Sequence, residues 1–501
     1  MTSSATSDSQ TAILAVDQGT SCTKGLAIGL DGRVLAQARS EIGQSHPRPG
    51  WVQQDAEEIL ASVLTVLEQL IDGLDVRVAA VALANQRESA IAWDRSSGQP
   101  LCPLLGWQDR RTSTRAAELG RAGVSEQIQA RTGLPLDPMF SALKFEWLLD
   151  RIDPDRSRAR HGEILLGTVD SFIVHRLTGR HSIEAGNASR TQLLDVQRMS
   201  WDDELLELFR IPPQALPEVV DSNTRLPFAR GLRDLSSLNL NAVLGDSHAA
   251  LYGHGVRHPG AVKATYGTGS SIMGLMADGS SVGVGLARTV AWQLDGSPTH
   301  AFEGNILATG ATIAWLARVF DTTPGELFEI ARDVEVLHGV DLVPAFAGLA
   351  APWWADQAQA ILSGFTLGTD RAVVARAAID SIVLQIDDVL DAAQLASGAI
   401  ALMLADGGPS RNDWLMQLQA DISRRVVRRS RLPELSAFGA ARLAADSVGM
   451  PIDVQAIEGD MDEFRPQFSP ATAQARRALW RAAVERALAR PLRAMPVRTM
   501  T

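Results

Sequence analysis

The chain has 501 residues and a formal net charge of −11, with 47 basic and 58 acidic side chains. This acidic balance argues against a nucleic-acid-binding protein, which usually carries a basic face. The length predicts two or three domains, each large enough for its own core. Cys22 and Cys102 are its two cysteines, so we expect a cytoplasmic protein without a disulfide framework.

The N-terminal part predicts a short tail followed by an α/β pattern. Residues 1–10 are polar and lack the basic start and apolar stretch of a secretory signal, so we expect a disordered tail there. Hydrophobic spacing then predicts a β-hairpin over 13–39 that turns at Asp31-Gly32, a helix over 55–74 and a strand over 76–83. Polar residues 85–88 follow this strand, as in α/β folds whose strands end at a site.

The rest of the chain predicts a second α/β region. An apolar strand over 241–244 precedes Gly245-Asp246, and the Gly- and His-rich segment 252–260 indicates a domain boundary. We therefore expect an N-terminal domain over 11–256 and a C-terminal domain over 257–495. The second domain has a predicted helix over 371–395, a strand over 401–404 and a final helix from Ser469-Pro470 to about 492. Aspartates interrupt the first of these helices, which indicates a buried helix and not a membrane span.

Two similar Gly-Thr segments lie half the chain apart. They are Asp17-Gln18-Gly19-Thr20 and Tyr266-Gly267-Thr268-Gly269. Each follows an apolar run and combines glycine, which lets backbone N–H groups approach an anion, with a hydroxyl donor. Alone, the first segment is more typical of an ordinary β-turn. Together, the two segments indicate two like domains that serve one nucleotide.

Lysine is rare in this chain. Of the 47 basic side chains three are lysines, Lys24, Lys144 and Lys263. Lys24 follows the first Gly-Thr segment and Lys263 precedes the second. Since arginine does not replace a compact ammonium group everywhere, these lysines are candidates for specific roles, with retention by chance as the alternative.

A third glycine segment, Asp406-Gly407-Gly408 with Asn412, completes the order of loops of an actin-like nucleotide site. With it, the sequence resembles the FGGY carbohydrate kinases, and among them the glycerol kinases most. The resemblance covers about residues 12–450 and is carried by segments 15–21, 50–55, 85–88, 106–112, 187–191, 245–246, 266–269, 343–346 and 406–408. It implies an α/β, two-domain, actin-like (ribonuclease H-like) fold with the active site in an interdomain cleft.

The resemblance also implies a role for each matching residue toward ATP and Mg²⁺. The residues near the ATP phosphates would be Thr20, Ser21, Cys22, Lys24 and Thr268. The nucleoside would lie beside Gly310, Gly408 and Asn412, while Ala314 stands where the family often has glutamine. Asp17 and Asp246 would hold Mg²⁺, which keeps several of its waters. Asp246 would also be the general base; without the resemblance, its place before an alanine-rich run favours a helix N-cap.

The same resemblance places the acceptor beside Arg87, Glu88, Trp107 and Asp246. Charged groups that bind vicinal hydroxyls, with an aromatic wall along the carbon chain, suit a polyol. Without the resemblance, a surface ion pair and a core aromatic residue are the ordinary interpretations of the first three residues. His248 and His254 lie near the base, but their spacing makes no metal site, and we expect them to be packed or solvated.

Three positions of the acceptor pocket differ from the glycerol kinase pattern. Met139 replaces a tyrosine, Ser247 a glutamine and Ser271 a phenylalanine. These changes free space and alter hydrogen bonding, so we expect an acceptor larger than glycerol, a polyol or sugar of four or five carbons. Glycerol itself is the first alternative, and an actin-like or chaperone-like ATPase is the alternative from another class. We expect no nucleic-acid or membrane partner, and the sequence leaves a homo-oligomer open.

Overall fold

The computed structural model describes residues 11–229, 237–283, 285–432, 434–454 and 461–489. The chain divides into two compact units. The first consists of Met1–Arg257, Ala287–Ala301 and Glu434–Gly459, and the second of His258–Leu286, Phe302–Pro433 and Asp460–Thr501. Each unit is therefore assembled from separate stretches of chain. The predicted tail over 1–10 lies outside the described residues, and the domains over 11–256 and 257–495 stay a prediction.

The first unit centres on a six-stranded sheet in the order β13-β14-β5-β1-β2-β3. Its strands are β1 (Thr11–Gln18), β2 (Cys22–Gly29), β3 (Val34–Glu41), β5 (Arg77–Asn85), β13 (Leu226–Pro227) and β14 (Asn239–Gly245). Strands β1, β2 and β3 form an antiparallel meander, while β5 runs parallel to both β1 and β14. The predicted hairpin over 13–39 is thus part of three strands, and Gly32, with φ of 81°, makes the predicted turn.

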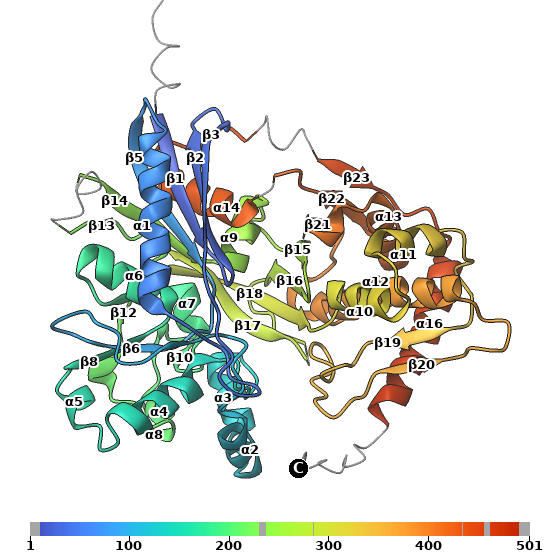
Figure 1. The fold of residues 1–501 in the computed structure, drawn as a ribbon, viewed down its shortest axis with the longest axis horizontal. Helices are drawn as coiled ribbons and strands as arrows, with labels where there is room; N and C mark the ends of the chain where they lie inside the picture. Colours follow the sequence, from blue (N-terminus) through green and yellow to red (C-terminus); the bar gives the residue numbers. More distant parts are fainter. Residues whose placement is uncertain (1–10, 230–236, 284, 433, 455–460, 490–501) are drawn as a thin grey trace, which may run out of the picture. The chain divides into compact units, whose positions relative to one another are not determined.

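Helices cover both faces of this sheet. Successive side chains of a strand point to opposite faces, and the central strands β1 and β5 are apolar at successive positions, so both faces need a cover. Leu14 and Leu83 share a core with Ile59 of α1 (Ala56–Asp72), which runs along the sheet (Figure 1). The alternate positions are small, as at Ala15, and α14 (Leu435–Ser447) packs there against β1, β5 and β14. Asp55 accepts hydrogen bonds from the first turn of α1 and caps it, which confirms the predicted helix.

Close packing joins α14 to α9 (Asp246–Gly253). A Cβ atom on Gly439 would lie 1.8 Å from the carbonyl oxygen of Ala249, so glycine is required where the two helices meet. The segment that completes the first unit therefore begins at residue 434, far along the sequence from the strands of its sheet.

A helical region lies between β5 and β14 in the sequence; most of its helices share a core of their own, while the apolar side chains of residues 169–177 pack into the core of the sheet. Its helices are α2 (Ser113–Arg121), α3 (Ser125–Thr132), α4 (Ser141–Ile152), α5 (Ser157–Arg160), α6 (Val169–Thr178), α7 (Ala185–Ser189) and α8 (Asp203–Leu208). Short strand pairs brace it, namely β4 (Gln53–Gln54) with β7 (Leu104–Leu105), β6 (Ile91–Asp94) with β8 (Ile164–Gly167), β9 (Ser182–Glu184) with β12 (Glu218–Val220), and β10 (Leu194–Asp195) with β11 (Ser200–Trp201).

The second unit uses a seven-stranded sheet in the order β17-β18-β16-β15-β21-β22-β23. Its strands are β15 (Ala261–Tyr266), β16 (Ser270–Leu275), β17 (Ala287–Leu294), β18 (Ser297–Ile306), β21 (Leu402–Gly407), β22 (Val426–Arg429) and β23 (Asp462–Phe464). Strand β15 pairs antiparallel with β16 and parallel with β21. By its contacts the stretch 287–301 is grouped with the first unit.

The predicted helix over 371–395 is α12 (Arg371–Ser397), which lies in the core of the second unit. The other helices are α10 (Gly310–Val319), α11 (Pro324–Ala331), α13 (Asp413–Ser423) and α16 (Pro470–Leu488), and β19 (Asp341–Val343) pairs with β20 (Ile361–Ser363). Helix α16 ends at Leu488, short of the predicted 492. Among the described residues, no helix is long and apolar enough to cross a membrane.

Candidate active site

The candidate site of the first unit lies at one edge of its sheet. Gln18 at the end of β1 pairs with Asn85 of β5, and Asn85 pairs with Gly245 of β14. Because these three strands are parallel neighbours, the residues that follow their carboxyl ends meet at the same edge. This topology brings together Arg87 and Asp246, which are 159 residues apart in the sequence.

Asp246 is the first residue of α9, and Gly245 occupies the N-cap position. The interpretation of Asp246 as the N-cap residue is therefore wrong, because the strand runs one residue further than its apolar stretch. Oδ1 of Asp246 accepts hydrogen bonds from Nε of Arg87 at 3.0 Å and from the backbone N–H of Ser247 at 2.6 Å. The side chain remains 40% exposed, so the carboxylate is held through one oxygen and is accessible.

Arg87 and Glu88 are both buried, which excludes a surface ion pair. Glu88 adopts a φ of 58°, in the left-handed region that glutamate rarely occupies. Its Oε1 accepts a hydrogen bond from Nε of the buried Arg190 at 2.5 Å and lies 3.9 Å from Nη1 of Arg87. A buried carboxylate between two guanidinium groups is charge-compensated and fixed in position.

Asp17 lies near the end of β1, and one of its two carboxylate oxygens has no hydrogen-bond partner among the described residues. This oxygen, Oδ1, is buried and accepts no hydrogen bond from them. Burial, reinforced by the charge of Asp246, raises the pKa of Asp17 to about 7. An orphaned carboxylate oxygen of this kind fits a hard cation such as Mg²⁺, which binds proteins through one or two carboxylates.

The first Gly-Thr segment forms a tight turn between β1 and β2, in which the N–H of Gly19 donates to the carbonyl of Cys22 at 3.0 Å. Thr20 and Cys22 are half-buried, and Ser21 is exposed. Lys24 pairs across the strands with Asp17 and forms an ion pair with Glu434 at 2.8 Å. Sequence reasoning missed Glu434, because 410 residues separate it from Lys24.

Trp107 is 37% exposed and is therefore not the core aromatic residue of the alternative interpretation. Its Nε1 donates to Oγ1 of Thr20 at 3.1 Å. The predicted acceptor wall thus lies beside the predicted phosphate loop. Met139 follows in a turn after Asp137, whose Oδ1 accepts its N–H at 2.8 Å, and its side chain packs with Phe140 in a small cluster.

The second Gly-Thr segment connects β15 to β16 in the second unit and contacts the start of α10. The carbonyl of the exposed Thr268 accepts the N–H groups of Thr309 and Ala311, both at 3.0 Å, and the carbonyl of Gly267 accepts the N–H of Gly310 at 3.0 Å. A Cβ atom on Gly310 would lie 2.5 Å from that same Gly267 oxygen. The loop and the helix start are therefore held together through their backbones.

The third glycine loop lies at the same sheet edge, because β21 runs parallel to β15 and Gly407 pairs with Tyr266. Gly407 has a φ of 92°, and a Cβ atom on it would lie 2.0 Å from the Tyr266 carbonyl oxygen. Gly408 is exposed, with open space where a Cβ atom would be. Oδ1 of Asn412 caps α13 through the N–H of Leu415 at 3.0 Å, a structural role that the sequence did not indicate.

Ser271 is also in the second unit, on β16, where its Oγ donates to Oε1 of the buried Glu303 at 3.1 Å. Within the first unit, His248 and His254 are both buried, as expected for packed histidines. Among the described residues, no group of three or more His, Cys, Asp or Glu side chains forms a metal site. Ala314 is exposed on α10.

Sequence reasoning missed a set of polar side chains beneath the first site. Nε2 of Gln86 donates to Gln54 at 3.0 Å and to Gln18 at 3.3 Å, and Nε2 of Gln54 donates to the carbonyl of Thr20 at 2.9 Å. Asn85 and Asn187 are hydrogen-bonded at 2.9 Å. Residues 85–88 and 187–191 both belong to the segments that carried the resemblance, which was the available signal.

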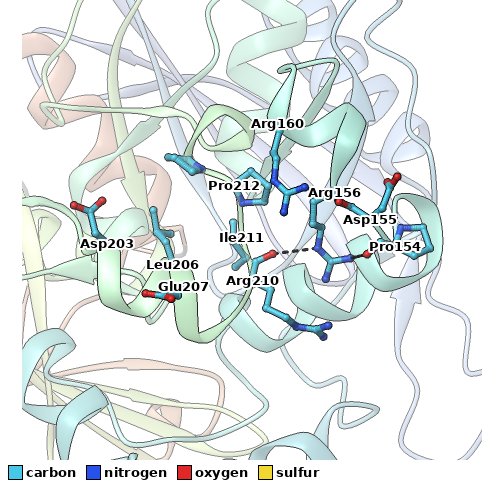
Figure 2. A pocket seen from close by; sticks show the side chains of 11 residues that line it. Pro154, Asp155, Arg156, Arg160, Asp203, Leu206, Glu207, Arg210, Ile211 and Pro212 are labelled. Carbon is cyan, nitrogen blue, oxygen red and sulfur yellow. Dashed lines mark hydrogen bonds between the residues drawn. The ribbon is translucent and has the colours of Figure 1, made fainter.

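A cavity of about 480 Å³ lies elsewhere in the first unit, lined by residues of 154–160 and 203–213 (Figure 2). It contains none of the predicted site residues. The guanidinium group of Arg156 donates there to the carbonyl of Arg210 at 3.1 Å and to Asp150 at 2.5 Å. Because the cavity contains none of the predicted site residues and the guanidinium group of Arg156 already has hydrogen-bond partners, we do not consider this cavity a candidate active site.

Comparison with known proteins gives a consistent result. Residues 12–227 match the N-terminal domain of the FGGY family of carbohydrate kinases, and residues 262–447 match the C-terminal domain. A glycerol kinase of Alkalilimnicola ehrlichii is 39% identical over 485 residues, which cover 95% of this chain and 98% of that protein. An apulose kinase of Pectobacterium atrosepticum is 38% identical over 491 residues, which cover 96% of this chain and 99% of that protein.

A solved structure agrees with the sequence relatives. The crystal structure of Plasmodium falciparum glycerol kinase with ADP superposes with a TM-score of 0.89 at 27% identity, and covers 96% of this chain and 99% of that one. The predicted two-domain α/β fold is thereby confirmed. The two family matches, the relatives along the whole length and the sheet edges that carry the predicted residues lead to one conclusion: the chain belongs to the FGGY family of carbohydrate kinases and is an ATP-dependent phosphotransferase.

Proposed function

We propose that this kinase transfers the γ-phosphoryl group of ATP to a hydroxyl group of a small polyol or sugar with four or five carbons. The observation that carries the proposal is the hydrogen bond from Arg87 to Asp246 at the edge of the first sheet, beside the buried Glu88. It provides an oriented, accessible carboxylate next to charged groups that suit a polyhydroxy substrate.

In this mechanism Asp246 is the general base. Arg87 holds Oδ1, which leaves the carboxylate oriented toward the acceptor hydroxyl. Asp246 takes the hydroxyl proton while the hydroxyl oxygen bonds to the γ-phosphorus, and the bond between that phosphorus and the oxygen of the ADP leaving group breaks. Positioning and charge neutralisation supply most of the catalysis in such a transfer.

Backbone N–H groups and hydroxyls provide the neutralisation. Thr20 and Ser21 in the first unit, and Thr268 in the second, lie in glycine-containing loops, a kind of segment that can present backbone N–H groups to a phosphate chain. Gly310, Gly408 and Asn412 would contact the nucleoside. In our proposal these groups from both units serve the same ATP.

Mg²⁺ fits the oxygen donors that the first unit provides. Asp17 has a buried oxygen without a hydrogen-bond partner among the described residues, and Asp246 has an exposed carboxylate. These two residues would hold the ion together with substrate phosphates and water. When bound, Mg²⁺ would neutralise charge on the transferring phosphoryl group.

The proposed acceptor size depends on Met139, Ser247 and Ser271. Compared with the glycerol kinase pattern they remove a phenol, an amide and an aromatic wall, and pockets discriminate most through hydrogen bonds. Overall identity does not decide the acceptor, because relatives named glycerol kinase and apulose kinase match equally well. Glycerol phosphorylation is therefore the second candidate function.

A coupled ADP-release assay across C3–C6 polyols and sugars tests the proposal. We expect the highest kcat/KM for a four- or five-carbon acceptor and little ATP hydrolysis without acceptor, since a closed site excludes water. A clear preference for glycerol would support the second candidate. Hydrolysis without acceptor at the best stimulated rate would contradict both candidates and support an ATPase.

A further inference from the structure

Lys144, on α4, is fully buried in the first unit. Its Nζ donates to the backbone carbonyl of Glu88 at 2.8 Å and to the backbone carbonyl of Met139 at 2.6 Å. Glu88 and Met139 are 51 residues apart in the sequence, and both belong to the proposed acceptor pocket. One ammonium group therefore ties together the two chain segments that carry them.

Burying a lysine side chain costs free energy unless its polar atom is hydrogen-bonded, so we asked what the buried Nζ of this lysine stabilises. The hydrogen-bond partners of Nζ are backbone carbonyls, and burial lowers the pKa of Lys144 to about 7. An uncharged amine still has two N–H groups, enough for both carbonyls. The connection thus persists whichever protonation state the side chain adopts, which suits a role in geometry and not in proton transfer.

The segment that Lys144 holds is conformationally unfavourable by itself. Glu88 has a φ of 58°, and a non-glycine residue in this region is maintained only by its surroundings. A second bond from the first turn of α4 acts on the same loop, because Oγ of Ser141 donates to the carbonyl of Ser89 at 2.9 Å. The first turn of α4 therefore fixes two consecutive peptide groups of the loop.

We infer that Lys144, assisted by Ser141, is a positioning residue that sets the separation between Glu88 and Met139 and thereby the acceptor specificity of this kinase. The inference rests on the proposed function, in which Glu88 and Met139 contact the acceptor. Because Lys144 holds the backbone of Met139 and not its side chain, a substitution at position 139 should leave the loop that carries Glu88 in place.

The test compares K144M and S141A with wild type, using the best acceptor from the screen, glycerol and ATP. A misplacement of pocket groups raises the acceptor KM of K144M about tenfold or more. The single lost hydrogen bond of S141A raises it about threefold. Both variants should keep the ATP KM within about twofold of wild type and change the ratio of kcat/KM between the best acceptor and glycerol.

R151M is the matched control, because Arg151 lies on the same helix but stacks on Trp147, 4.0 Å from the ring centroid. It should leave both KM values unchanged. A merely structural role of Lys144 predicts lower thermal stability with parallel changes for ATP and acceptor, and no change in acceptor preference. That result in K144M would overturn the inference, and if K144M does not fold, S141A decides by the same criteria.

E88Q separates this inference from the proposed function. If E88Q raises the acceptor KM while K144M and S141A do not, Lys144 is no positioning residue and the proposed function stands. If E88Q leaves the acceptor KM unchanged, Glu88 does not contact the acceptor, and both the proposed pocket and the inference built on it are wrong.

Discussion

Nε of Arg87 lies 3.0 Å from Oδ1 of Asp246, and the two residues follow the ends of neighbouring parallel strands. Of the two side chains, only that of Asp246 is accessible, since the Arg87 side chain is 7% exposed and the Asp246 side chain 40%. The arginine holds the carboxylate from inside the protein and leaves its outer side exposed, where we propose that the acceptor binds.

Replacing the general base should stop the reaction without emptying the nucleotide site. In D246N the amide cannot accept the hydroxyl proton, so we expect kcat to fall by about 10²–10⁴. ATP affinity, measured by titration calorimetry, should change little, because the glycine loops proposed to contact ATP are untouched and Asp17 remains to hold Mg²⁺. A D246N enzyme with near-normal turnover would rule out Asp246 as the base.

Gly245 tests how closely Arg87 must be held. A Cβ atom at position 245 would lie 2.5 Å from Cδ of Arg87, while the φ of −61° suits alanine. G245A should therefore displace the guanidinium group and lower kcat/KM about 10–100-fold. G325A, at an exposed position of α11 where the methyl group would meet Oγ1 of Thr323 at an ordinary van der Waals distance of 3.9 Å, is the matched control and should keep full activity.

The acceptor preference should respond to the three altered positions. We expect M139Y/S247Q/S271F, which restores the glycerol kinase pattern, to shift the kcat/KM ratio toward glycerol by about 10-fold or more. S97Q, in an exposed turn, is the control. An unchanged ratio in the triple variant would show that these positions do not determine the acceptor.

Asp17 should set the requirement for magnesium. Its orphaned oxygen has no other partner among the described residues, so D17N should raise the Mg²⁺ concentration for half-maximal activity about tenfold or more, since an amide is a weaker ligand than a carboxylate. Magnesium titrations at saturating ATP and acceptor measure this. An unchanged magnesium dependence would contradict the proposed metal ligand.

The second unit contains a buried ion cluster, in which Asp380 is surrounded by His338, Arg376 and Arg476. We expect this cluster to contribute strongly to the stability of the protein at low pH. Burial alone would raise the pKa of Asp380, but the hydrogen bond with His338 and the charges of Arg476 and Arg376 outweigh it and hold that pKa well below its usual range. The stabilisation is thus complete above the ordinary value of 3.8 and is lost as the pH falls below it.

D380N should consequently lower the free energy of unfolding at pH 7 by about 3–5 kcal/mol, because it removes the carboxylate of the buried Arg376 and leaves the buried Arg476 with Asp341 alone among the described carboxylates. Urea unfolding monitored by circular dichroism measures the loss. E329Q, which removes an exposed ion pair with Arg332, should change the stability by less than about 1 kcal/mol. Equal effects of the two substitutions would show that the cluster is not stabilising.

The sequence predicted those parts of the molecule that depend on neighbouring residues. The apolar spacing of α1 and α12 and the turn at Gly32 are local signals, and each is confirmed. The N-cap interpretation of Asp246 failed because strand and helix meet there without an intervening loop, so composition alone could not locate the first helical residue.

Pairings across long stretches of sequence could not be predicted. The ion pair between Lys24 and Glu434 exists only because α14 returns to the first sheet. Nothing in the spacing of Lys144 indicates that its side chain is buried between two carbonyls. Residue identities thus indicated which groups are candidates for the chemistry, while the groups that hold these candidates in place required the structure.

The discontinuous composition of the first unit has a consequence for biosynthesis. Strands β1, β5 and β14 leave the ribosome well before α14, the helix that packs on their alanine-rich face. Until residue 447 has been translated, that face lacks its cover and exposes apolar surface to chaperones or to neighbouring nascent chains. The sheet that carries Asp17, Arg87 and Asp246 therefore matures late, and a polypeptide released early would contain the candidate site residues of this sheet without the helix that completes it.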